Sequence, residues 1–235
     1  MENYQNYYTQ SEQALDSRVS AVMKRVYVKM FLALLVTAFV SLFCASSQAV
    51  QSIFFSNRAF MWGTLIVVPI LFFAITGAIN KISSGTATLL FFIYAVINGL
   101  ALFPIFWIYT GVSIAKTFFI TAGTFGAMSI YGYFTSQDLS KWGSILVMAL
   151  FGLIICSVVN FFWAKNSTLE WIISGAGVLI FVGLTAWDTQ KIKNWAATAP
   201  AESTSKLATI GALSLYLDFI NLFLYLLRFF GNSRD

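Results

Sequence analysis

The sequence contains no histidine, and only 10% of its 235 residues are charged. Without histidine, Ser-His-Asp and Cys-His catalysis, histidine-ligated zinc and a histidine pH switch are all excluded. The two cysteines, Cys44 and Cys156, are too few for a disulfide framework or a four-cysteine metal site, and both lie in apolar runs. The chain therefore lacks the side chains of the commonest catalytic and metal sites, and we expect neither an enzyme nor a bound cofactor.

Apolar residues, by contrast, make up 59% of the chain. A soluble domain is about a quarter charged, so this composition indicates an integral membrane protein surrounded by a lipid bilayer. The net charge of +5 is explained by loop residues on one side of a membrane, and we expect no nucleic-acid partner.

Seven charge-poor stretches are long enough to cross a bilayer, since a spanning helix needs about 20 mostly apolar residues. None has the alternation of a barrel strand. The sequence therefore predicts an all-α integral membrane protein, a bundle of seven transmembrane helices. We expect the spans at residues 28–48, 59–80, 85–109, 117–137, 142–164, 171–188 and 207–227. Residues 1–25 are predicted to form a short polar cytoplasmic tail, 26–230 a single membrane domain and 231–235 a C-terminal tail.

Basic residues are distributed unevenly among the predicted loops. If the N-terminus is cytoplasmic, nine of the 14 basic residues lie inside and five outside. The positive-inside rule therefore favours a cytoplasmic N-terminus and, after seven spans, a C-terminus on the opposite side.

Two acids, Asp188 and Asp218, lie near or within the spans, where a charge costs ~3 kcal/mol at mid-helix. Asp218 belongs to a polar seam on the last helix, whose members follow at helical intervals and share one face. Lipid cannot satisfy such groups, so this helix is expected in the middle of the bundle or beside a cavity. The seam consists of Gly211, Ser214, Asp218, Asn221, Tyr225 and Arg228.

Two interpretations of the seam stay open. Ser214, Asn221 and Tyr225 can line a functional cavity or only hold helices together by hydrogen bonds. For Asp218 a function is favoured, because asparagine would serve a structural role without the charge.

Asp188 ends its predicted span, and it can either pair with Lys191 near the headgroups or meet Asp218. The second arrangement has a depth problem, since Asp218 lies 12 residues after Lys206, ~18 Å along a helix. The two acids meet only if the helices extend beyond the bilayer or Asp188 is drawn inward. Two such carboxyls cannot easily both ionise, so they would share a proton and respond to pH. They could also hold Ca²⁺ weakly and transiently, because a tight site needs six to eight oxygens.

Two segments resemble the signature of the Bax inhibitor-1, or transmembrane Bax inhibitor motif, family. They are Thr-Ala-Trp-Asp-Thr-Gln at 185–190 and Leu-Tyr-Leu-Asp-Phe-Ile-Asn-Leu-Phe at 215–223. The likeness extends over the whole chain and is greatest to bacterial members. It implies seven helices with the last one central, and a pH-sensitive calcium leak gated by the aspartates that match Asp188 and Asp218. Ca²⁺ would then be the permeant ion, in a bacterial inner membrane.

The resemblance further implies a basic residue at the cytoplasmic end of the second helix that contacts the aspartates in one state. Lys81 is the only candidate there, and an ordinary loop lysine is the alternative. Lysine also lacks the bidentate fork of the arginine found in other family members.

Two other functions remain open. One is a regulator that binds other membrane proteins, for which Gly123, Gly126 and Ala127 could form a packing face, although packing within the bundle is favoured. The other is an intramembrane aspartyl protease. Its usual Tyr-Asp and Gly-x-Gly-Asp sequences are absent, because Trp187 precedes Asp188 and Leu217 precedes Asp218.

Overall fold

The structure is a computed structural model that describes residues 2–232 and the side chains of residues 13–64, 66–200 and 202–232. In this part of the chain all regular structure is helical, as predicted. The helices are α1 (Glu2–Ser46), α2 (Gln48–Ser56), α3 (Arg58–Ala78), α4 (Ser84–Leu102), α5 (Ile105–Ile108), α6 (Gly111–Phe134), α7 (Ser140–Val159), α8 (Ser167–Thr198) and α9 (Thr204–Phe230). A π-helical turn, Asn160–Ala164, extends α7, and a 3-10 turn, Ala201–Ser203, joins α8 to α9.

Six stretches of the described chain are long and apolar enough to cross a membrane. They lie within α1, α3, α4–α5, α7 with its π-helical turn, α8 and α9. The predicted fourth span corresponds to α6, which is not among the six. Its 24 residues include Lys116 and nine glycines, serines and threonines, which lower its apolar character. A helical membrane protein is thus established, and the number of seven spans stays a prediction.

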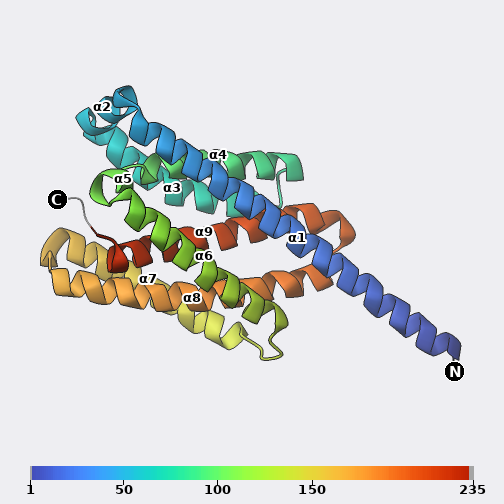
Figure 1. Cartoon of the computed structure of the whole chain (residues 1–235). Helices are drawn as coiled ribbons and strands as arrows, with labels where there is room; N and C mark the ends of the chain where they lie inside the picture. The colour runs from blue at the N-terminus through green and yellow to red at the C-terminus, as the bar shows by residue number, and fades with distance from the viewer. Residues whose placement is uncertain (1, 233–235) are drawn as a thin grey trace.

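The long helices run between two ends of the bundle (Figure 1). The turns α3–α4, α6–α7 and α8–α9 lie at one end, which we call the turn end, and α2, α5 and the α7–α8 turn lie at the other, the far end. α9 finishes at the far end, where the backbone N–H of Asn232 donates to Ser113 Oγ at 2.8 Å. α6 connects the two ends as the other long helices do.

α9 packs against α1, α4, α6 and α8. Of its most apolar stretch 67% is buried inside the protein, against 11–44% for the other five candidate spans. Within its polar seam, Gly211 and Asp218 are buried, whereas Ser214, Asn221 and Tyr225 are partly buried and Arg228 is exposed.

The polar segment before the first span is the beginning of α1, and it is helical from Glu2 onward. Val19, Val22 and Met23 are buried in the same core cluster as residues of α8 and α9. The tail boundary predicted at residue 25 consequently falls within a packed helix.

Candidate ion-gating site

The two aspartates lie on adjacent antiparallel helices at similar distances from the turn that joins them. α8 continues for ten residues after Asp188, and α9 begins fourteen residues before Asp218. At 1.5 Å per residue these are ~15 and ~21 Å of helix. Both helices thus extend well past the acids, which removes the depth problem. Asp188 is 8% exposed and Asp218 is 4% exposed.

The carboxyl groups of Asp188 and Asp218 lie close enough to interact with each other. Asp188 also forms an ion pair with Lys191, whose Nζ lies 3.3 Å from its Oδ1. Asp188 therefore contacts Lys191 and Asp218 at the same time, although the sequence offered these two contacts as alternatives. Oδ2 of Asp218 is buried and has no hydrogen-bond partner among the described residues. An unpartnered buried oxygen is costly unless it is protonated or meets a cation or water.

Lys191 is held in place by aromatic rings as well as by charge. Its Nζ lies 4.4 Å from the ring centroid of Trp187 and 4.7 Å from that of Trp195. An ammonium group over the face of an indole is attracted by the ring quadrupole. The ammonium group of Lys191 is thus positioned beside the pair by three residues of its own helix.

Both acids line a cavity of about 490 Å³ between α3, α4, α7, α8 and α9. The seam residues Ser214, Asp218, Asn221 and Tyr225 all lie on its α9 wall. The remaining lining residues are Val68, Pro69 and Phe72 of α3, Tyr94 of α4, Val147, Leu150 and Ile154 of α7, Phe181, Leu184, Trp187, Asp188 and Lys191 of α8, and Leu217 of α9. We call this space the aspartate cavity. It is polar on α8 and α9 and apolar on α3 and α7.

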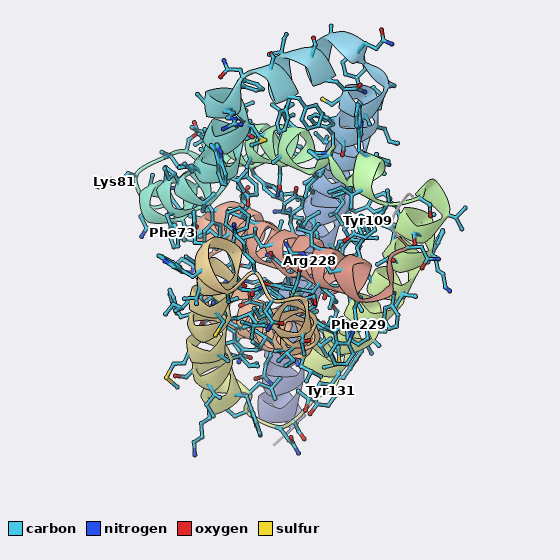
Figure 2. The ribbon with its side chains drawn as sticks, turned by 90° about the vertical axis from the view of Figure 1, so that its left-hand side faces the viewer. Phe73, Lys81, Tyr109, Tyr131, Arg228 and Phe229 are labelled. Carbon is cyan, nitrogen blue, oxygen red and sulfur yellow. The ribbon has the colours of Figure 1, made fainter. Side chains whose placement is uncertain are left out.

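The structure does not bring Lys81 to this cavity. Lys81 is exposed in the turn between α3 and α4 and is absent from the cavity lining. Figure 2, which views the bundle from the far end, places Lys81 at the periphery and Arg228 near the centre. In this conformation the cation at the aspartates is Lys191.

Tyr94 is a cavity residue that the sequence did not reveal. It is fully buried, and its hydroxyl has no hydrogen-bond partner among the described residues. A single tyrosine in an apolar span carries no pattern that would distinguish it from a core residue. Only the packing of α4 against α9 brings it to the cavity.

Few metal ligands gather here. Within the described residues, no group of three or more histidines, cysteines, aspartates and glutamates could hold a metal ion. The oxygens available to a cation in the cavity belong to Asp188, Asp218 and the neutral side chains of Ser214, Asn221, Tyr94 and Tyr225. Such a set suits brief contact better than tight binding, because Ca²⁺ prefers six to eight oxygens.

A helical membrane bundle with a buried carboxyl pair is the class of protein that fold and site define. Residues 19–235 match the protein family described as "Inhibitor of apoptosis-promoting Bax1", and the chain belongs to this family. It is 50% identical over 215 residues to the inner membrane protein YbhL of Escherichia coli K12, covering 90% of this chain and 92% of that protein. An uncharacterized protein of Borreliella burgdorferi is 46% identical, with 91% and 92% covered. One of Rickettsia prowazekii is 43% identical, with 97% and 96% covered.

Proposed function

We propose that this protein is a pH-sensitive leak channel for Ca²⁺, gated by Asp188 and Asp218. The observation that carries the proposal is the buried carboxyl pair in a cavity that also contains the ammonium group of Lys191 and a carboxyl oxygen, Oδ2 of Asp218, with no hydrogen-bond partner among the described residues. Ionisable groups at membrane depth are expensive and mark ion or proton pathways. Family membership gives the proposal its context.

Protonation of the pair is the proposed switch. Two carboxyls in contact and one lysine form a group in which a shared proton leaves no net charge in the cavity. Loss of that proton leaves a second negative charge without a partner, which favours entry of a cation or separation of α8 from α9. In the described lining of the cavity, the other titratable side chains are Tyr94 of α4 and Tyr225 of α9, and the residues of α3 and α7 are apolar.

The same proposal includes the topology. We infer seven spans with α6 among them, α9 as the central helix, and a cytoplasmic N-terminus in a bacterial inner membrane. The turn end then faces the cytoplasm, where Lys81, Lys141, Lys191, Lys193 and Lys206 lie. The aspartate pair lies toward that side.

Ca²⁺ flux into proteoliposomes as a function of pH tests the proposal. Wild type is expected to show a flux that changes steeply with pH. Asp188→Asn and Asp218→Asn, which keep the side-chain size, are expected to give a flux independent of pH. Wild-type protein that moves no Ca²⁺ at any pH would contradict the proposal.

A regulator that binds other membrane proteins is the second candidate. It is favoured by the small residues of α6, because Gly123 and Ala127 are exposed and an added side-chain carbon at Gly123 or Gly126 would meet nothing within 4 Å. These residues point out of the bundle, contrary to the packing within it that the sequence favoured. Crosslinking from Ala127→Cys in membranes, combined with absent ion flux, would favour this function.

A further inference from the structure

A second cavity, of about 830 Å³, lies beyond the aspartate cavity on the same helices. It is lined by residues of α7, the π-helical turn, α8 and α9, together with Lys165 of the α7–α8 turn, and we call it the outer cavity. Its polar lining residues are Ser157, Asn160, Lys165, Glu170 and Arg228. The two cavities are neighbours along α7 and α9. On α7, Ile154 lines the aspartate cavity, and Ser157, one turn later, lines the outer cavity. On α9, Tyr225 lines the aspartate cavity, and Arg228, one turn later, lines the outer cavity.

Tyr225 stands between the two cavities. Its side chain lines the aspartate cavity and interacts with Ser157, which lines the outer one. Its ring stacks on Phe181 of α8, with centroids 5.8 Å apart and an interplanar angle of 25°. Arg228 lines the outer cavity, and its guanidinium carbon, Cζ, lies 5.8 Å from the centroid of the Tyr225 ring. The stacked rings of Phe181 and Tyr225 thus line the aspartate cavity where it comes nearest to the outer cavity.

A glycine on α8 makes room for this ring. A Cβ added at Gly177 would lie 2.6 Å from Cγ and Cδ1 of Tyr225, closer than real Cβ contacts come. The aromatic ring is rigid and already packed against Phe181, so it could not remain where it is. The position of Tyr225 therefore depends on the missing side chain at residue 177.

We propose that the stacked rings of Phe181 and Tyr225 are a partition that separates the aspartate cavity from the outer cavity, and that a cation crosses only when the Tyr225 ring moves. The proposal rests on the leak-channel function and adds to it a second barrier, on the far-end side of the aspartates. The partition carries no ionisable carboxyl, so it opens by displacement of a ring rather than by loss of a proton.

Thiol accessibility tests the partition without any Ca²⁺ measurement. Asn221→Cys places a thiol in the aspartate cavity one turn from Tyr225, in a background with Cys44→Ser and Cys156→Ser. Among the described residues the Asn221 amide donates to the Leu217 carbonyl of its own helix and bonds to no other helix. A charged, membrane-impermeant thiol reagent is added to each side of sealed vesicles. From the outer-cavity side, we expect Tyr225→Ala to speed labelling tenfold or more and Tyr225→Phe, which keeps the ring, to leave it slow.

Gly177→Ala and Gly175→Ala form a matched pair on α8. The nearest atom to an added carbon at Gly175 is Phe229 Cε2, at an ordinary 3.8 Å. Gly177→Ala is expected to speed labelling and to raise Ca²⁺ flux several-fold, and Gly175→Ala to change neither. If Gly177→Ala weakens folding, the labelling rate of Tyr225→Ala decides whether the partition exists, because that substitution only removes atoms.

The outcomes separate the two proposals. Labelling that is equally fast in wild type and Tyr225→Ala, or equally slow in both, overturns the partition whether or not Ca²⁺ is conducted. Wild type without Ca²⁺ flux at any pH overturns the leak-channel function, whereas a ring-dependent labelling rate in the same protein still supports the partition.

Discussion

At the scale of single residues, the charge balance around the aspartates depends on Lys191. Among the described residues it is the only lysine or arginine in the lining of the aspartate cavity, and it is one turn from Asp188 on the same helix. Lys81, in contrast, is exposed in a turn and outside that lining. We therefore expect a substitution of Lys191 to shift the pH dependence of the Ca²⁺ flux and a substitution of Lys81 to leave it unchanged.

Lys191→Gln should move the midpoint of the flux profile to higher pH by about one unit. The ammonium favours the ionised form of Asp188, so without it the pair keeps its proton to higher pH, and one unit corresponds to about 1.4 kcal/mol. Lys193→Gln is the matched control, because Lys193 bonds to the carbonyl of Tyr133 and not to the pair. An unchanged midpoint in Lys191→Gln would show that Lys191 does not stabilise the ionised pair.

Lys81→Gln should leave the midpoint and the steepness of the pH profile as in wild type. Its charge is exposed to solvent in the conformation described, and such charges are strongly screened. Ca²⁺ flux across the same pH series checks this. A shift as large as that of Lys191→Gln would mean that Lys81 reaches the aspartates in another state.

At the scale of the helices, close approach between α6 and α8 fixes the position of the helix that carries Asp188. Gly132 of α6 packs directly on the backbone of Ala186, so an added Cβ would overlap the Ala186 carbonyl. Ala186 is two residues from Asp188. The packing that holds this part of α8 thus depends on a glycine of another helix.

Gly132→Ala should lower the free energy of unfolding by about 1–3 kcal/mol, the usual cost of overpacking a core. The backbone of Ala186 cannot yield as a flexible side chain would. Gly126→Ala on the same helix is the control, because nothing lies within 4 Å of its added carbon. Thermal unfolding in detergent compares the two, and equal midpoints would contradict the close packing of α6 on α8.

The sequence predicts the long helices well, because charge-free runs between basic residues define them. It does not predict that α8 continues to Thr198, since Lys191 and Lys193 follow Asp188 and mimic the end of a span. The α9 seam was predictable from its helical spacing, and the structure places four of its residues along one cavity. Tyr94 was not predictable, because its place in the cavity depends on contacts between helices distant in sequence.

At the scale of the whole molecule, the topology depends on α6. Seven spans put the two termini on opposite sides of the membrane, and six put them on the same side. α6 joins the far end to the turn end (Figure 1), although it is not among the six described stretches that are long and apolar enough to cross a membrane.

Cysteines at the two ends of α6 decide the number of spans. In the cysteine-free background, Gly111→Cys and Ser136→Cys should react with an impermeant thiol reagent from opposite sides of sealed vesicles. Both positions are exposed, so neither thiol is shielded by the bundle. Reaction of both from one side would show that α6 does not cross.

In the proposed gate, Asp188 and Asp218 act as one titrating unit. The most direct measurement compares the pH dependence of Ca²⁺ flux in proteoliposomes for both single Asp→Asn variants and the double variant. A shared proton is lost as soon as either carboxyl is gone, so all three should have the same flux, independent of pH, and the second substitution should add nothing. Single variants that each keep a steep pH response, which disappears only in the double variant, would contradict the account.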